Sequence, residues 1–353
     1  MSKKKKTIII VCAILAALLL VLLAGFLVLK GYLGQIRRFG ENEETLSQEQ
    51  IESMLNQTEA TDPNFTGVEM NSDDITEPTI PAQTITADDV INVLLVGQDR
   101  REGEGRRHSD SMVLVTINKF SKTITMTSFM RDLWVPIPDH YTERLNVPYM
   151  VGGFDLLNKT LDYNFGVCAD HNIEVDFAGF EAVVDAIGGV SVDLTDAEAK
   201  YLNKYGNWSN GETYYGDWTL KEGVNHLTGK QALAYSRIRD IDNDFGRTGR
   251  QRIVLEALLE QVKTMSTSNA LNLIKSLIPL VKTDMTDSEI ISLAMDILPM
   301  LSELEIVSQR IPADGAYSDV KLLHNGYTKY VLVMDEQDVE TNIKLLRTAM
   351  GIE

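Results

Sequence analysis

Cysteine is scarce in this sequence, with two residues in a chain of 353. Cys12 lies in an apolar run and Cys168 stands alone, so the sequence contains neither a CxxC pair nor a longer cysteine framework. Two such cysteines exclude a disulfide scaffold, and they exclude the common thiol-based metal and redox motifs. The chain must therefore fold around a hydrophobic core, for which its length is ample.

The common catalytic signatures are also missing. The sequence contains no G-x-x-x-x-G-K-S/T loop, no G-x-G-x-x-G, no H-E-x-x-H and no G-x-S-x-G. Its five histidines are scattered, at His108, His140, His171, His226 and His324. The usual nucleotide-binding, zinc-protease and serine-hydrolase classes therefore lack their signatures.

Basic residues are few, and the formal net charge is −18. Their distribution is uneven, because residues 1–40 carry seven bases and no acids, whereas residues 41–89 carry thirteen acids and no bases. From Val90 onward the chain remains acidic. Non-specific binding of nucleic acid needs a basic face, so we expect no nucleic-acid partner.

Only one hydrophobic run, Thr7–Leu29, is long and uncharged. As a helix it measures about 34 Å, which spans the hydrocarbon core of a bilayer. A cleavable signal peptide is the alternative, but the run exceeds the usual length and no A-x-A-like site precedes Lys30. Because Lys3–Lys6 precede the run, the N-terminus is expected to be cytoplasmic. We predict a cytoplasmic basic tail at 1–6, a single transmembrane anchor at 7–29, and a cell-membrane protein whose remainder is extracellular.

Residues 30–89 have the composition of an unfolded spacer. They include Pro63, Pro78 and Pro81, many acids and few apolar side chains. Such a segment buries too little apolar surface to offset the entropy cost of ordering. We predict an acidic extracellular stalk, with at most a short helix around Ser47–Met54.

Residues 90–353 alternate between two kinds of pattern. Runs typical of strands occur at Ile91–Val96, Met112–Ile117, Thr123–Phe129, Val190–Leu194 and Tyr330–Met334, the second and third forming a hairpin. Helical periodicity occurs at Phe154–Leu161, at Phe177–Ile187 and from about Gln337 to Met350. Capping boxes begin at Thr228 and Thr286. The pattern predicts one α/β domain with helices packed on a mixed sheet.

Arginine is clustered within this acidic domain, since ten of the fifteen arginines fall in three short places. They are Arg100, Arg101, Arg106, Arg107, Arg131, Arg237, Arg239, Arg247, Arg250 and Arg252. The planar guanidinium binds phosphate oxygens bidentately, so converging arginines favour a diphosphate ligand. The alternative is that each cluster is a solvated face paired with nearby acids. Arg131 directly follows a predicted strand, and Arg247, Arg250 and Gln251 share one helix face near an N-terminus, which favours an anion site.

Two carboxylates accompany the arginines. Asp99 follows the first predicted strand and Asp110 precedes the second, so the loop between them can bring both to one sheet edge. One or two carboxylates, waters and substrate phosphate oxygens are the usual ligands of Mg²⁺. Asp99 and Asp110 are therefore the predicted metal ligands, and either one is a candidate acceptor for a substrate proton.

Six motifs appear in an order that resembles the LytR-CpsA-Psr (LCP) family of Gram-positive cell envelopes. They are Gly97-Gln-Asp99-Arg100, Ser109-Asp110-Ser111, Ser128-Phe-Met-Arg131-Asp132, Val184-Asp-Ala-Ile-Gly-Gly-Val190, Gln231-Ala-Leu-Ala-Tyr-Ser-Arg-Ile-Arg239 and Asp244-Phe-Gly-Arg247-Thr-Gly-Arg250-Gln251. The resemblance implies a three-layer α/β/α domain with a mixed central sheet, a buried slot for a polyprenyl chain and a diphosphate at its mouth. It also implies transfer of a glycopolymer from a polyprenyl diphosphate carrier in the membrane to peptidoglycan, assisted by Mg²⁺ or Mn²⁺.

The resemblance also implies roles for particular residues. Asp99 and Asp110 correspond to the acidic pair near the metal. The catalytic and diphosphate-binding positions correspond to Arg131, Arg237, Arg239, Arg247 and Gln251, with Asp244 as an acid of the same motif. One departure is His108 where family members usually carry an arginine before Ser-Asp, and Arg107 is the nearest substitute.

Three activities fit these residues. A transferase passes the glycopolymer to peptidoglycan, and a hydrolase uses the same residues with water as the acceptor. A non-catalytic envelope regulator binds the lipid diphosphate without turnover. The intact arginine set favours turnover, and we expect the transferase.

Overall fold

The computed structural model describes residues 37–39, 46–59, 65–76, 78, 84–85, 87, 89–98, 106–205, 207–209, 212–214 and 218–352. The predicted tail at 1–6 and anchor at 7–29 lie outside these residues, so both stay predictions. Among the helices in the described ranges, none is long and apolar enough to cross a membrane.

A seven-stranded sheet forms the centre of the molecule, in the order β1, β13, β8, β3, β4, β5, β14. Its strands are β1 (Arg37–Arg38), β13 (Lys282–Thr283), β8 (His171–Asp176), β3 (Val90–Gln98), β4 (Ser109–Asn118), β5 (Thr123–Phe129) and β14 (Glu305–Ile311). β4 pairs antiparallel with both β3 and β5, which confirms the predicted hairpin, whereas β8 and β14 pair in parallel with β3 and β5. The sheet is therefore mixed, as expected.

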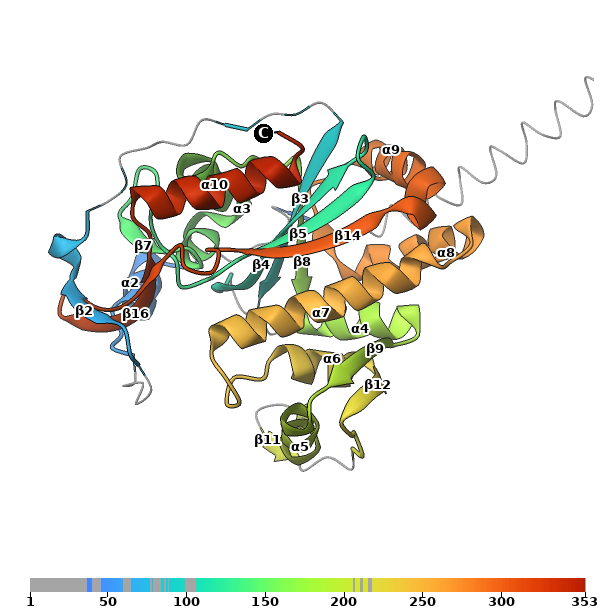
Figure 1. Cartoon of the computed structure of the whole chain (residues 1–353), viewed down its shortest axis with the longest axis horizontal. Helices are drawn as coiled ribbons and strands as arrows, with labels where there is room; N and C mark the ends of the chain where they lie inside the picture. Colours follow the sequence, from blue (N-terminus) through green and yellow to red (C-terminus); the bar gives the residue numbers. More distant parts are fainter. Residues whose placement is uncertain are drawn as a thin grey trace, which may run out of the picture.

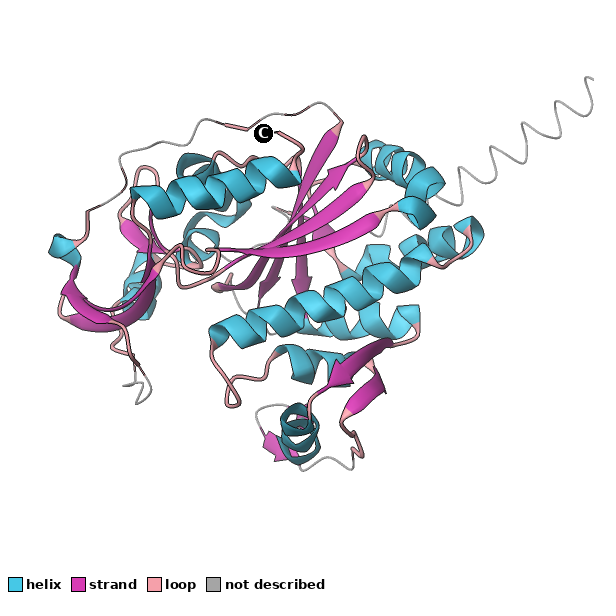
Figure 2. Cartoon of the chain, in the orientation of Figure 1, coloured by secondary structure: helices cyan, strands magenta, loops and turns pink. Residues whose placement is uncertain are grey.

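Helices cover both faces of this sheet (Figures 1 and 2). On one face, α3 (Val147–Phe165) and α10 (Glu336–Ala349) pack against inward-facing strand residues. On the other face, α7 (Asp244–Lys263) and α9 (Asp287–Ile297) do the same. Alternation along β4 explains the two layers, because Met112 and Leu114 belong to the first core, on the α3 side, whereas Val113 belongs to the apolar layer between the sheet and α7.

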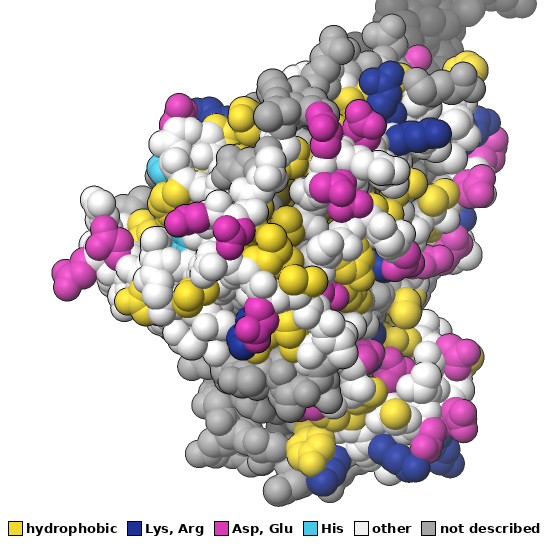
Figure 3. All heavy atoms as spheres, turned by 60° about the vertical axis from the view of Figure 1, so that its left-hand side comes forward, with side chains coloured by type: hydrophobic (Ala, Val, Ile, Leu, Met, Phe, Trp, Pro, Cys, Tyr) yellow, Lys and Arg dark blue, Asp and Glu magenta, His cyan; other side chains and the backbone are white. Residues whose placement is uncertain are grey.

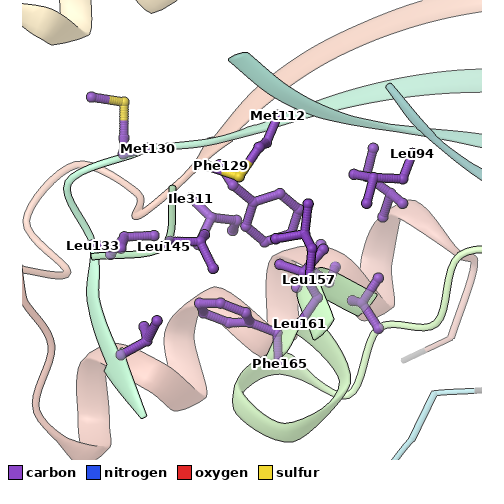
Figure 4. Close-up of a cluster of buried hydrophobic side chains, with 14 of the residues drawn as sticks. Leu94, Met112, Phe129, Met130, Leu133, Leu145, Leu157, Leu161, Phe165 and Ile311 are labelled. Carbon is purple, nitrogen blue, oxygen red and sulfur yellow. The ribbon is translucent and has the colours of Figure 1, made fainter. Parts of the chain in front are cut away.

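The first core is continuous from the sheet to α3 (Figure 4). Leu94, Phe129, Leu157 and Phe165 are almost completely buried there, and the Phe129 and Phe165 rings lie 5.4 Å apart. This core fixes the strand ends that carry the site described below.

A second core lies beneath α7. It joins β9 (Val190–Leu194) and β12 (Gly223–Leu227) to α4 (Phe177–Ile187), α5 (Asp196–Tyr205), α6 (Gly229–Ser236) and α8 (Thr267–Leu277). The bounds of α4 and β9 agree with the sequence prediction, and both predicted capping boxes are confirmed, at α6 and α9. The remaining short elements nearby are β10 (Asn207–Ser209), β11 (Glu212–Tyr214), η2 (Ile278–Leu280) and η3 (Leu298–Glu303).

A small three-stranded sheet sits at the left of Figure 1. It contains β16 (Tyr327–Val333), β15 (Ser318–His324) and β2 (Val68–Asn71), with η1 (Ser72–Asp74) after it and the β6 (Trp134–Pro136) and β7 (Thr142–Arg144) ribbon beside it. Lys329 of β16 and Glu143 of β7 form a fully buried ion pair, which ties this sheet to the ribbon.

The acidic segment differs from the free stalk that its composition indicates. α2 (Gln48–Leu55) begins with a capping box at Ser47 and packs Ile51 and Met54 against the core that contains Val147 and Met150. β2 extends the small sheet by pairing in parallel with β15. Composition alone does not predict these two ordered elements, because the apolar residues that α2 contacts belong to residues 90–353 and not to the acidic segment itself.

Candidate anion-binding site

The candidate site lies where three strands of the central sheet end. β3 ends at Gln98, which pairs with Ser109 at the beginning of β4 after a break in the register. β5 ends at Phe129, opposite Met112, so Arg131 and Asp110 are brought to the same edge. This edge is the one expected from the sequence, because antiparallel β4 begins where its neighbours finish.

Arg131 is the centre of an ion-pair network. Its Nη1 lies 3.3 Å from Asp110 Oδ1, its Nη2 lies 3.4 Å from Asp244 Oδ1, and its Nε lies 3.4 Å from Asp132 Oδ2. Burial alone lowers the pKa of Arg131, but the charges of Asp132, Asp244 and Asp110 raise it above its ordinary value. Arg131 therefore stays cationic throughout the working pH range.

Arg247 adds a second guanidinium from the first turn of α7, which Asn243 caps through a 3.3 Å bond from Gly246 N to Asn243 Oδ1. Two of its nitrogens contact the Asp244 carboxylate, with Nε to Oδ1 and Nη2 to Oδ2 both 2.8 Å. Its Nη1 donates to the main-chain oxygen of Asp110 at 3.3 Å. Burial by itself raises the pKa of Asp244, but Arg131 and Arg247 lower it below its ordinary value.

Arg239 is the most exposed member of the cluster, with 53% of its side chain accessible. Its Nη2 lies 3.7 Å from Asp110 Oδ1, the same oxygen that Arg131 and Arg247 approach to 3.3 and 3.9 Å. Burial and the neighbouring charges of Arg131 and Arg247 lower the pKa of Arg239. Three guanidinium groups thus surround one carboxylate oxygen, and the accessible Arg239 places positive charge at the site's surface.

Arg237 contacts an aromatic ring. It is the C-terminal cap residue of α6, and its guanidinium stacks over the Phe177 ring at 4.4 Å from the centroid. Gln251, one turn beyond Arg247, is half-buried and makes no side-chain hydrogen bond to the cluster within the described part of the chain. The structure therefore brings together Asp110, Arg131, Arg239, Asp244 and Arg247, while Asp99 lies outside the described residues.

Arg250, which belongs to the same motif as Arg247, is a packing residue. It is buried, its Nε donates to Glu198 Oε1 at 2.7 Å, and its Nη1 donates to Ile238 O and Asp242 Oδ1 at 3.1 Å each. These bonds raise its pKa although burial lowers it. Arg250 joins α7 to α5 and to the loop that carries Arg239.

His108 does not supply the charge of the arginine that family members usually carry at this position. Burial, followed by the charge of Arg144, lowers the pKa of His108 to about 4, so the ring is neutral at pH 7. Arg107 contacts this edge through its main chain, because its N–H donates to Gln98 Oε1 at 3.2 Å.

Sequence reasoning missed three residues that support the site. Asp132 follows Arg131 in the Ser128-Phe-Met-Arg131-Asp132 motif. Its pKa is raised, because the effect of burial exceeds the opposing effect of the Arg131 charge. Arg144 Nη1 lies 3.7 Å from Asp132 Oδ1 and also pairs with Glu59, whose other oxygen accepts from Tyr330 N at 2.8 Å. Asp132 could have been identified from the sequence, because it directly follows Arg131. Nothing in the sequence distinguishes Glu59 from the other acids of its segment.

Few carboxylates at this site are available to bind a metal ion. The described residues contain no cluster of three or more His, Cys, Asp or Glu side chains suited to a metal. Mg²⁺ does not require one, because one or two carboxylates suffice when waters and phosphate oxygens complete the shell. Asp110 is partly exposed at the site and fits one such position.

The face of the molecule shown in Figure 3 carries basic side chains as well. On the face shown in Figure 3, the Lys and Arg side chains of the described residues are interspersed with Asp and Glu and form no continuous basic surface.

Known proteins share this sequence pattern and fold. The sequence profile of the LytR_cpsA_psr family matches residues 48–347. Regulatory protein MsrR of Staphylococcus aureus (strain COL) is 30% identical over 243 residues, covering 68% of this chain and 69% of MsrR. Polyisoprenyl-teichoic acid–peptidoglycan teichoic acid transferase TagT of Bacillus subtilis (strain 168) is 36% identical over 183 residues, covering 51% of this chain and 55% of TagT.

A solved structure of the LytR-CPS2A-psr family protein YwtF (TagT) with bound octaprenyl pyrophosphate lipid has the same fold. It is 26% identical, and the match covers 78% of this chain and 98% of that one with a TM-score of 0.56. The mixed α/β fold expected from the sequence is thus confirmed.

Proposed function

Since the chain belongs to the LytR_cpsA_psr family, we propose that it transfers a glycopolymer from an undecaprenyl diphosphate carrier to peptidoglycan and releases the lipid monophosphate. The polymer class is a teichoic acid, a capsular polysaccharide or a similar chain. The observation that carries the proposal is the convergence of Arg131, Arg239 and Arg247 within 4 Å of one Asp110 oxygen.

The names of the relatives support a lipid-linked donor. TagT is named as a transferase that moves teichoic acid from a polyisoprenyl carrier to peptidoglycan, and YwtF (TagT) binds octaprenyl pyrophosphate. Both ligands carry a phosphate group that arginines recognise bidentately. The three guanidinium groups around Asp110 have this chemistry.

The proposed reaction is attack by an acceptor sugar hydroxyl on the phosphorus that bears the glycan. The P–O bond to the lipid phosphate breaks, and the lipid monophosphate leaves with the electron pair. Negative charge increases on the phosphate oxygens and the leaving group, and fixed arginines stabilise that charge. Arg131 and Arg247 are held in place by Asp244, so little reorganisation is needed when the charge develops.

The hydroxyl proton needs an acceptor, and the site offers carboxylates. Asp110 is partly exposed at the edge of the sheet, and Asp99 is the second candidate from the sequence. Asp99 and Asp110 would also hold Mg²⁺ or Mn²⁺, which when bound would neutralise charge on the diphosphate. Either role requires the carboxylate form at neutral pH.

Reconstitution of the full chain in detergent tests the proposal directly. The assay combines lipid-diphosphate-linked glycan with peptidoglycan fragments, with and without chelator. We expect a glycan–phosphate–peptidoglycan adduct that accumulates in step with lipid monophosphate, and slower transfer in chelator. Lipid monophosphate released at the same rate without the acceptor, and without adduct, would instead indicate a hydrolase.

A regulatory role is the second candidate, because MsrR is named a regulatory protein. A regulator of this kind binds the lipid diphosphate without turnover. Stoichiometric lipid binding with neither adduct nor lipid monophosphate in the same assay would favour it.

We propose a membrane topology in which the N-terminus is cytoplasmic and residues beyond the anchor are outside. Cys168 is free and exposed, so it reports the side on which the body lies. Burial and the charge of Asp162 raise the pKa of its thiol, so labelling with an impermeant maleimide is best performed near pH 8. We expect labelling of intact cells that Cys168→Ser abolishes, whereas labelling only after lysis would contradict the topology.

A further inference from the structure

Two arginines outside the network described above have buried nitrogen atoms without a hydrogen-bond partner. Arg252 lies on α7 and Arg310 on β14, and the Nη1 atom of each is buried and unpaired within the described part of the molecule. Ser128 Oγ on β5 is a third buried donor in the same condition. Buried donors without acceptors are costly, and native proteins keep few of them.

These three donors lie in one place. Ser128 and Arg310 are register partners in the parallel pair of β5 and β14, so their side chains share one face of the sheet. That face is covered by α7, because Met126, two residues before Ser128, belongs to the core that contacts α7 through Leu255 and Leu259. Figure 1 shows α7 running alongside β14.

α7 contributes a stripe of three residues toward the arginine of β14. Phe245, Gly249 and Arg252 occur at positions i, i+4 and i+7, which is one side of a helix. The Arg310 guanidinium lies over the Phe245 ring at 4.2 Å from the centroid. Burial and the charge of Arg310 lower the pKa of Arg252, which agrees with two like charges being close together.

The acids nearby do not satisfy the two inner nitrogens. Asp314 pairs with Nη2 of Arg310 and is itself 93% exposed. Glu256, one turn beyond Arg252, acts on that residue through its charge. Each acid therefore acts on one arginine, and the two Nη1 atoms are left for another acceptor.

Gly249 leaves room in the middle of the stripe. A Cβ placed there would meet only Arg252 Nη2, at 4.0 Å, among the described atoms outside its own helical turn. A glycine in the interior of a helix costs stability relative to alanine. Its place between Phe245 and Arg252 keeps the approach to the guanidinium groups free of a side chain.

We propose that Arg252, Arg310 and Ser128 form a second oxyanion-binding site, separate from the Arg131 network, that takes a carboxylate or phosphate group. The two guanidinium groups and the hydroxyl can donate hydrogen bonds to the oxygens of such a group. The site adjoins the first one, because Ser128 is three residues before Arg131 and Phe245 follows Asp244.

The location indicates what carries the oxyanion, and this step rests on the proposed function. A group bound here sits beside the reacting diphosphate, so it belongs to one of the two polymers that meet there. The source is either a carboxylate of the peptidoglycan acceptor or a phosphate of the donor polymer. In both cases the site orients a polymer and is not itself catalytic.

Binding of inorganic phosphate tests the site without any activity. The probe is titrated calorimetrically into the full-length Arg131→Ala protein in detergent, in which the first site is weakened. Added to this background, Arg252→Gln or Arg310→Gln should weaken phosphate binding at least tenfold. Gly249→Leu should do the same by filling the approach while leaving every charge in place. Asp314→Asn should strengthen binding because it removes a competing carboxylate.

Lys200→Gln is the matched control, because Lys200 is a cation whose side chain is 75% exposed on α5. Near-ultraviolet circular dichroism confirms that each variant is folded. Equal phosphate affinity in the Lys200, Arg252 and Arg310 variants would overturn the proposal, as would an unchanged affinity in both Gly249→Leu and Asp314→Asn.

Transfer kinetics in the otherwise wild-type chain then distinguish the two sources. A tenfold rise in the KM for the peptidoglycan fragment in Arg252→Gln, with an unchanged KM for the donor, identifies an acceptor carboxylate. The reverse pattern identifies a phosphate of the donor polymer. If neither KM changes, the assignment to the polymers is wrong. If the wild-type chain shows no transfer, the proposed function fails while the phosphate titration still decides whether the site exists.

Discussion

Arg247 and Arg250 are buried arginines three residues apart on the same helix, yet they belong to different parts of the molecule. Arg247, 3% exposed, contacts Asp244 and Asp110 at the edge of the central sheet. Arg250, 4% exposed, contacts Glu198 and Asp242 in the second core. Arg247 faces the edge of the central sheet. Arg250 faces α5 and the loop that contains Ile238 and Asp242, and it links the two.

The comparison shows that burial and pairing do not identify a functional arginine. What distinguishes Arg247 is that an accessible arginine, Arg239, approaches the same acidic partner. Arg247 shares Asp110 with the half-exposed Arg239, so a ligand can reach the cluster. Glu198 and the helix around it enclose Arg250 on its inner side. The two residues should therefore fail in different ways when truncated.

Arg250→Ala should cause the largest loss of stability. Removing one partner of a buried ion pair leaves Glu198 without its counter-charge, which costs about 3–5 kcal/mol. The urea midpoint of the full chain in detergent measures this loss. Transfer activity per folded molecule should be close to that of the wild type, and a selective loss of activity at unchanged stability would place Arg250 in the site.

Arg247→Ala should show the opposite pattern. Removing one fixed donor from a charge-stabilising site lowers the rate about 10²–10³-fold, whereas Asp244 keeps a partner in Arg131 at 3.4 Å. Single-turnover transfer measures the rate. Arg247→Lys should recover little, because lysine lacks the bidentate fork.

Lys200→Ala is the control for the loss of positive charge in general, since that side chain is exposed and far along the chain from the site. A similar loss of rate in Lys200→Ala and Arg247→Ala would mean that overall charge, not the cluster, determines turnover.

His108 extends the comparison to a neutral residue at the same edge. Its pKa of about 4 lies below the ordinary value of 6.5, so the unfolded chain binds the proton first as the pH falls. The contribution of the neutral His108 ring to the free energy of unfolding is therefore fully present above pH 6.5. It falls by about 3 kcal/mol as the pH is lowered toward 4. His108→Gln should flatten this part of the stability profile, as measured by urea midpoints between pH 7 and pH 4.5. An unchanged slope in the variant would show that the ring is not buried in its neutral form.

Much of the central fold could be predicted because it depends on local patterns. The β4 and β5 hairpin follows from alternation, and α4 and β9 follow from apolar spacing closed by glycines. The proximity of Arg131 and Asp110 could be predicted as well, because both lie at strand ends that must meet once β4 is antiparallel to β5.

The rest depended on contacts that no local pattern encodes. Glu59 and α2 lie in a segment whose composition indicates a spacer, and they become ordered only against the body. Arg247, Arg250 and Arg252 are close together in the sequence, but they point in different directions around α7 and therefore have different surroundings. Sequence spacing gives the face of a helix, and only packing shows what that face meets.

Thr228→Ala should have the smallest effect, and it tests whether stability alone changes activity. Thr228 caps α6, the helix that ends at Arg237 just before Arg239, through its reciprocal bonds with Gln231. Losing this cap costs about 1 kcal/mol, so the urea midpoint should fall slightly. Because α6 is also held by its buried residues in the second core, Arg239 should keep its position and the single-turnover rate should not change. A fall in rate comparable to that of Arg247→Ala would mean that the position of Arg239 depends on the cap, and that the distinction between site and scaffold does not hold on this side of the cluster.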